Sequence, residues 1–134
     1  MTVKTFYRVK FFDTDVMGVV HHSNYIRWFE TGRVEFLRAL DLTLGEMMSD
    51  GILFPIVEVG AKFHSPAKFD DELEICTTAE ALTRAKMKFN YVIRRRGEEK
   101  ILAEGTSTNV FTSGGKICRL PEKFFTRLVK GLDE

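Results

Sequence analysis

Apolar and polar side chains alternate along most of the second half of the chain. A period of two is typical of a strand that buries one face and exposes the other. Glycine and proline, which favour turns, interrupt the alternation at positions such as Pro66 and Gly97. The runs that predict antiparallel strands are residues 57–64, 73–80, 87–94 and 101–112.

The first third of the chain shows a helical period instead. A run rich in β-forming residues at 5–12 predicts a first strand. From 24 to 40, apolar residues recur every three or four positions, which predicts an amphipathic helix capped by Ser23 or Asn24. Gly32 lies on the apolar side, where the missing side chain lets a helix approach a flat surface such as a sheet. The expected buried stripe is Tyr25, Trp28, Phe29, Gly32, Phe36, Leu37 and Leu40.

Two shorter helices complete the predicted order of elements. Residues 43–51 predict a short helix that ends at Gly51, and residues 121–132 predict a last helix with Pro121 at its start. No helix-length segment separates the later strands, so parallel crossover units are not expected. We therefore predict an α+β fold, with one long helix covering an antiparallel sheet of about five strands. The whole chain, 1–134, is expected to form a single domain.

Composition narrows the classes of function. The net charge is +1 with 29% charged residues, so no strong field favours nucleic acid. The basic run 94–96 precedes a glycine and is expected at a solvated hairpin end. Two cysteines without a CxxC motif are typical of a reducing compartment. No signal peptide is recognised, and no run approaches the roughly 20 apolar residues of a membrane span. We expect a cytoplasmic protein.

Two carboxylates and two imidazoles crowd the segment FFDTDVMGVVHHSNY. The plainest interpretation of Asp13 and Asp15 is a polar turn, because aspartate side chains bond to nearby backbone. A metal site would add His21, His22 and His64 as ligands, but adjacent histidines rarely reach one ion. An Asp-x-Asp after an apolar strand also resembles haloacid-dehalogenase phosphatases, but their parallel sheet needs crossover helices that are not predicted here.

The same segment also suits hydrolysis of a thioester. It leads into the start of the predicted helix, where free N–H groups and the positive end of the helix dipole point outward. Such donors stabilise negative charge on a carbonyl oxygen. The carboxylate of Asp15 could attack that carbonyl, or deprotonate a water that does. A thioester needs little more, because its carbonyl is electrophilic and its thiolate leaves readily.

The segment FFDTDVMGVVHHSNYIRWFETGRVEFL closely resembles the opening motif of bacterial hot-dog-fold acyl-CoA thioesterases. The nearest types are the hydroxybenzoyl-CoA thioesterase and the Tol–Pal-associated (YbgC-type) thioesterase. FHSPAKFDDELEI and ILAEGTSTNVF match later strands, so the resemblance spans essentially the whole chain. It implies a long helix wrapped by a strongly curved antiparallel sheet. The motif residues are Asp13, Asp15, Gly18, Val19, Val20, Asn24, Tyr25, Trp28 and Phe29.

The resemblance also implies roles for the motif residues. It implies that Asp15 is the catalytic carboxylate, acting as nucleophile or general base. It further implies that the main-chain N–H of His22 polarises the thioester carbonyl. By the same resemblance, Gly18, Val19 and Tyr25 are expected to contact the substrate.

An acyl-CoA is the substrate that the resemblance implies, with an acyl carrier protein as a second candidate partner; no cofactor and no metal are implied. Arg84 and Lys86 occupy the stretch that holds the nucleotide phosphates in relatives, and Lys116 and Arg119 are weaker candidates. Ordinary solvated charges are the alternative interpretation. Unpaired sheet edges favour pairing between subunits, so we expect a homodimer or homotetramer. Met17 replaces the family's usual small residue, which bears on acyl preference.

Other interpretations stay open on the same fold. A non-catalytic module would bind acyl-CoA or acyl carrier protein without turnover. A hot-dog dehydratase typically has a His-x-x-x-Phe-Pro-Gly loop, which is absent from the sequence. A second hot-dog lineage carries its catalytic carboxylate on the long helix, which makes Glu30 and Glu35 the rivals to Asp15. Both lie off the apolar stripe and are expected to face solvent or an interface.

Overall fold

The computed structural model describes residues 1–132. The strands are β1 (Thr2–Arg8), β2 (Ile56–Phe63), β3 (Glu72–Leu82), β4 (Lys86–Arg95), β5 (Ile101–Val110), β6 (Thr112–Ser113) and β7 (Lys116–Ile117). The helices are α1 (Ser23–Ala39), α2 (Leu44–Ser49) and α3 (Glu122–Val129), with 3-10 helices at Phe11–Asp13 and Lys130–Leu132. The order of strand, long helix and then a run of strands is the predicted one.

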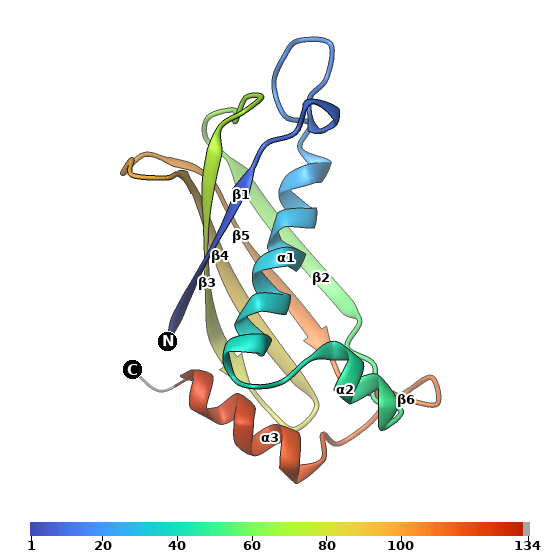
Figure 1. The fold of residues 1–134 in the computed structure, drawn as a ribbon. Coiled ribbons are helices and arrows are strands. Elements are labelled where there is room, and N and C mark those ends of the chain that lie inside the picture. The colour runs from blue at the N-terminus through green and yellow to red at the C-terminus, as the bar shows by residue number, and fades with distance from the viewer. Residues whose placement is uncertain (133–134) are drawn as a thin grey trace.

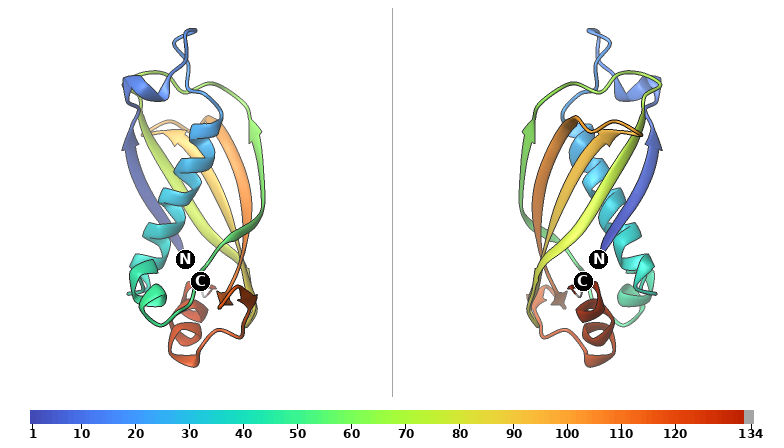
Figure 2. Two further views of the ribbon diagram at one scale, coloured as in Figure 1. Left: turned by 90° about the vertical axis from the view of Figure 1, so that its right-hand side faces the viewer. Right: turned by 90° about the vertical axis from the view of Figure 1, so that its left-hand side faces the viewer.

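Strands β1 to β5 form one antiparallel sheet in the order β1-β3-β4-β5-β2. The sheet curves around α1, which packs mainly over β1, β3 and β4 (Figure 1 and Figure 2). Helix α3 lies beyond the C-terminal end of α1, and the loop before α1 projects from the opposite end of the sheet (Figure 1). This arrangement confirms the predicted α+β hot-dog fold with a five-stranded sheet.

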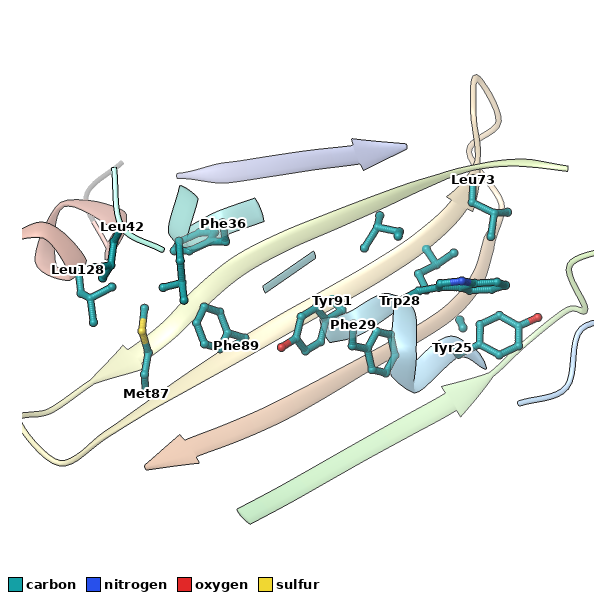
Figure 3. Close-up of a cluster of buried hydrophobic side chains, with 14 of the residues drawn as sticks. Tyr25, Trp28, Phe29, Phe36, Leu42, Leu73, Met87, Phe89, Tyr91 and Leu128 are labelled. Carbon is teal, nitrogen blue, oxygen red and sulfur yellow. The ribbon is translucent and has the colours of Figure 1, made fainter. Parts of the chain in front are cut away.

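The alternation in β3 and β4 places one apolar row of each strand under α1. Phe29 of α1 stacks on Tyr91 with ring centroids 4.6 Å apart, and Phe36 meets Phe89 edge to face at 5.5 Å (Figure 3). Burying each such side chain contributes about 2–3 kcal/mol. The predicted helical stripe is confirmed, with only Leu40 partly exposed. The fully buried sheet residues include Leu73, Ile75, Met87, Phe89, Tyr91 and Ile93.

Two glycines mark where the helix and the sheet approach most closely. A Cβ added at Gly32 of α1 would lie 2.3 Å from Oγ1 of Thr77, on β3. A Cβ added at Gly105 of β5 would lie 2.4 Å from the Phe29 ring. No side chain fits at such distances, because the interior is already close-packed. The predicted close approach at Gly32 is confirmed, whereas the one at Gly105 was not anticipated.

The predicted strand 5–12 is too long. β1 ends at Arg8, and Phe11–Asp13 forms a 3-10 turn. The Asp13 carboxylate accepts a hydrogen bond from the Lys10 N–H at 2.8 Å, which favours the turn over an extended chain. As a result, the rings of Phe11 and Phe12 are exposed rather than paired into the sheet.

Residues 57–64 were predicted to form a half-buried strand; the strand is present as β2, but the predicted half-burial is wrong. β2 pairs with β5 on one side only and forms an edge of the sheet. Its side chains are exposed on both faces, with only Ala61 partly covered. Val57 keeps 60% and Val59 keeps 42% of its surface exposed. The alternation in this strand therefore reflects a face that the chain alone does not cover.

The basic run 94–96 lies at the β4–β5 hairpin, as predicted, where Gly97 takes a positive φ of 82°. Arg95 donates to Asp71 at 2.8 Å, and Arg96 reaches Glu72 at 3.4 Å. Pro121 is the N-cap of α3, close to its predicted position. Among residues 1–132, no helix is both long and apolar enough to cross a membrane.

Candidate active site

Asp13 is a structural residue that joins β1, the loop and α1. Its side chain is buried and accepts hydrogen bonds from the Tyr7 hydroxyl at 2.7 Å and the Lys10 N–H at 2.8 Å. Its carbonyl accepts from the Asn24 amide at 2.9 Å. The pKa of Tyr7 is raised to about 12, first because the ring is partly buried and then because its hydroxyl bonds to the negatively charged Asp13. The Asp13 carboxylate is therefore committed to holding the loop.

Asp15 lies on a tight hairpin that the same loop forms. Its N–H donates to the Val19 carbonyl at 2.9 Å, and its carbonyl accepts from the Gly18 N–H at 3.0 Å. Gly18 takes the left-handed φ of 78° that this turn requires. The Asp15 side chain is exposed, and its Oδ1 accepts from the Met17 N–H at 2.8 Å. Oδ2 has no hydrogen-bond donor within residues 1–132, which leaves it available for chemistry.

The start of α1 presents an open backbone donor. The His21 N–H donates to the Asp13 carbonyl at 3.2 Å, and the Ser23 N–H donates to His21 Nδ1 at 3.2 Å. Between them, the N–H of His22 has no acceptor in the described part of the chain. It lies at the positive end of the helix dipole, where donors stabilise developing negative charge.

The cap predicted at Ser23 or Asn24 is wrong. The N-cap position is His22, with helical dihedral angles and no side-chain cap bond. Asn24 is instead buried beneath the loop, where its amide satisfies the Asp13 carbonyl. The Asn24 amide is therefore committed to the loop and does not cap the helix start.

A pocket of about 260 Å³ opens beside the helix start. The Tyr25 and Phe63 rings form one wall, with their centroids 5.2 Å apart. The centroid of the His22 ring lies 5.5 Å from that of Phe63. The Tyr25 hydroxyl accepts from the Ala67 N–H at 2.9 Å, and burial raises its pKa. The pocket is lined by Val19, Val20, His22, Tyr25, Phe63, His64, Ser65 and Pro66.

The structure therefore gathers most of the predicted site at one end of α1. Val19, His22 and Tyr25 line the pocket, whereas Asp15 and Gly18 lie on the adjoining hairpin. Sequence reasoning did not anticipate Ser65. Ser65 lies more than 40 residues after His22 in the chain, and the turn after β2 brings it to the pocket. A local sequence pattern therefore could not predict its position.

Arg84 and Lys86 do not lie near this pocket. The Arg84 guanidinium stacks 3.8 Å above the Phe125 ring and pairs with Glu122 of α3. α3 lies at the C-terminal end of α1, roughly 25 Å from the helix start for 17 residues at about 1.5 Å each. Lys86 is exposed near the same end. One chain alone does not bring these cations to Asp15.

The rival carboxylates are also distant from the helix start. Glu30 is exposed and lies 3.7 Å from Arg33, one turn further along α1. Glu35 pairs with Arg38 at 3.3 Å and lines a separate hollow against β1. Among residues 1–132, no group of three or more His, Cys, Asp or Glu side chains is arranged to hold a metal ion.

A single helix enclosed by a curved antiparallel sheet is the architecture of the hot-dog thioesterases. Residues 9–128 match the family model of the thioesterase-like superfamily. The chain belongs to this superfamily, and it is an enzyme of the thioester hydrolase class.

Individual relatives agree with this assignment. A putative esterase of Aquifex aeolicus (strain VF5) is 32% identical over 116 residues, which cover 87% of this chain and 89% of that protein. The acyl-CoA thioester hydrolase YbgC of Escherichia coli O157:H7 is 32% identical over 82 residues, 61% of each chain. The crystal structure of a hypothetical protein from Thermus thermophilus covers 100% of both chains, with a TM-score of 0.93 and 33% identity.

Proposed function

We propose that this chain hydrolyses acyl-CoA thioesters at the start of α1, with Asp15 as the catalytic carboxylate. The observation that carries the proposal is the His22 N–H, which has no acceptor among residues 1–132 and lies beside a pocket at the positive end of a helix. A relative named as an acyl-CoA thioester hydrolase supports coenzyme A as the leaving group.

The chemistry needs few groups. The thioester carbonyl oxygen accepts a hydrogen bond from the His22 N–H, which stabilises the negative charge that grows on it. Asp15 either attacks the carbonyl carbon to form an anhydride that water then cleaves, or takes a proton from the water that attacks. The carbon–sulfur bond breaks in both cases, and coenzyme A leaves as the thiolate. The two routes use the same carboxylate.

A second copy of the chain would complete this site. The edge strand β2 exposes unpaired backbone groups and apolar side chains, which favour pairing with another subunit. Since Arg84 and Lys86 lie far from Asp15 in one chain, they would reach the phosphates of coenzyme A only at a site on another copy. An acyl carrier protein as the alternative acyl donor would use the same pocket.

Substitution of Asp15 tests the catalytic carboxylate. Asp15→Asn is expected to lower kcat by at least about 100-fold, because asparagine neither attacks nor accepts a proton. Asp70→Asn is the matched control, since Asp70 is exposed and its positive φ of 71° tolerates asparagine. Thiol release from a panel of aromatic, short-chain and long-chain acyl-CoAs is the measurement. Full activity in Asp15→Asn, with loss in Glu35→Gln, would refute the assignment.

Two substitutions at one position separate the backbone of His22 from its ring. His22→Ala keeps the N–H, so a mild effect on kcat is expected. His22→Pro removes the N–H at a position whose φ of −64° proline already prefers. His22→Pro is expected to lower kcat by about 100- to 1000-fold, which is the usual effect of removing one hydrogen-bond donor to the oxyanion. If His22→Ala loses as much as His22→Pro, the ring carries the function.

The competing function is a module that binds acyl-CoA without hydrolysing it. It predicts no thiol release from any member of the panel, together with saturable binding of acyl-CoA by calorimetry. Turnover that disappears in Asp15→Asn excludes this alternative.

A further inference from the structure

Arg33 of α1 is a buried cation that lacks a full set of partners among residues 1–132. Its side chain is only 5% exposed, and neither Nε nor Nη1 has a hydrogen-bond acceptor within the described residues. The nearest carboxylate oxygen, on the exposed Glu30, is 3.7 Å from Nη2. An arginine keeps its charge at physiological pH, and a buried charge is unfavourable unless its polar atoms are paired and hydrogen-bonded. The ion pair with Glu30 therefore leaves two of the three guanidinium nitrogens, Nε and Nη1, without an acceptor in the described part of the chain.

The neutral groups around Arg33 do not supply an anion for these guanidinium nitrogens. Tyr91 and Ser107 bond to each other at 2.5 Å, and Phe29 stacks on the Tyr91 ring (Figure 3). Arg33 lies close enough to Tyr91 to offset part of the rise that burial causes in the pKa of that phenol. Neutral hydroxyls and rings of this kind do not balance a full positive charge.

Arg33 lies in the direction that an acyl chain takes if it runs along α1 from the proposed site. Side chains on a helix lean toward its N-terminus, and Nη2 accordingly points to the turn that carries Glu30. That turn is eight residues from His22, roughly 12 Å along α1. If the thioester carbonyl lies at the His22 N–H and the acyl chain runs along α1, the far end of the chain therefore points toward the guanidinium of Arg33.

The inner face of β2 gives this path an apolar wall. Phe63 lines the pocket beside His22, and Val59 is four residues back along the same face. Val59 pairs in register with Ser107, which bonds to Tyr91 next to Arg33. Phe63 and Val59 are 49% and 42% exposed, so no part of the described chain fully covers them. The wall therefore begins at the pocket and ends at the level of the cation.

We propose that Arg33 binds a carboxylate at the far end of the acyl group, so that the enzyme prefers thioesters of dicarboxylic acids. This inference rests on the proposed hydrolysis of acyl-CoA at the start of α1. An extended chain advances about 1.2 Å per bond, and hydrogen bonds at each end take up part of the 12 Å span. The fitting acyl groups are those of about six to ten carbons.

Kinetics with two thioesters of equal length tests the proposal. Wild type is expected to hydrolyse suberoyl-CoA with a kcat/KM at least about 10-fold above that for octanoyl-CoA, as for one hydrogen-bonded charge pair. Arg33→Met should lose this preference through a raised KM for suberoyl-CoA, while octanoyl-CoA is cleaved as well as before or better. Arg33→Lys keeps the charge and should retain part of the preference. Arg38→Met, an exposed arginine on α1, is the control and should change neither substrate.

The outcomes separate this proposal from its alternatives. Equal hydrolysis of both thioesters by wild type overturns it. If Arg33→Met dissociates the assembly in sedimentation and lowers both activities alike, the missing anion belongs to a second copy of the chain, and the proposal is wrong. Calorimetric titration with free suberate and octanoate needs no turnover. Suberate binding that is lost in Arg33→Met, without cleavage of any acyl-CoA, would uphold the Arg33 site while refuting the proposed hydrolysis.

Discussion

Asp13 and Asp15 are the same residue type two positions apart, yet their environments differ. Asp13 is buried and accepts two hydrogen bonds from β1 and the following turn. Asp15 is exposed, with a single backbone donor on one oxygen. The first carboxylate is consumed by the fold, and the second is free to react. The family resemblance implied the catalytic role for Asp15, and that role stays a prediction; the hydrogen bonds show how the environments of the two carboxylates differ.

The hydrogen bond from the Tyr7 hydroxyl to Asp13 predicts that the folded state is less stable at high pH. The pKa of Tyr7 is raised from 10.0 to about 12, because burial and Asp13 disfavour the phenolate in the folded state. The stabilisation is therefore complete below pH 10 and is lost as the pH rises toward 12. Chemical denaturation across this range is expected to show a falling free energy of unfolding, with a smaller fall in Tyr7→Phe. Equal slopes for the two proteins would contradict this account.

The long helix was the most predictable element, because its stripe has a strong period and is long enough to average over exceptions. The stripe predicted its buried face and the close approach at Gly32. It did not reveal that Arg33 is buried beside the apolar positions, although the residue lies four after Phe29 and three before Phe36. A charged residue at this helical spacing indicates a buried charge, which a search for apolar positions alone does not detect.

Gly32→Ala should destabilise the protein, against the usual trend for helices. Alanine normally gains up to about 1 kcal/mol over glycine inside a helix. Here the new Cβ would lie 2.3 Å from Thr77 Oγ1, and overpacking of this kind costs roughly 1–3 kcal/mol. Gly45→Ala in α2 is the matched control, because its nearest neighbour would lie 3.9 Å away.

Urea denaturation measures both changes in the free energy of unfolding. A loss for Gly32→Ala and a gain for Gly45→Ala are expected. Adding Thr77→Ala to the first variant removes the clashing atom and should restore part of the lost stability. A gain in stability from Gly32→Ala alone would show that the sheet can move away from the helix.

The whole molecule leaves one edge of its sheet unfinished. β2 exposes apolar residues such as Val57 and Val59, and α1 packs mainly over the strands toward the opposite edge. Exposed apolar surface on a flat edge strand favours association. A second copy on β2 would cover this surface and bring another set of cations toward Asp15.

Val59→Lys is expected to separate the subunits, because a charge on an edge strand opposes pairing. Sedimentation should shift from a dimer or larger assembly to a monomer, with loss of thioesterase activity. Phe6→Lys on β1 is the matched control, since it places the same charge on an exposed apolar residue of the opposite edge. A wild-type monomer with full activity would refute subunit pairing through β2.

The sequence by itself determined the elements whose pattern repeats over many residues. The period of two in β3 and β4 and the period of 3.6 in α1 predicted one helix on an antiparallel sheet, because burial of one face imposes those spacings. Gly97 was expected in a turn, and it takes the positive φ that favours glycine. These features depend on neighbours in the chain.

Only the tertiary structure decided which groups meet. It brought the end of β2 to the start of α1 and placed Arg84 at the far end of the helix. It also left the His22 N–H without an acceptor in the part of the chain that the structure describes. It also showed that β2 is an edge although it alternates like an inner strand. Such facts depend on strand order and on contacts between residues 40 or more positions apart, and a local pattern cannot encode which strand lies beside which.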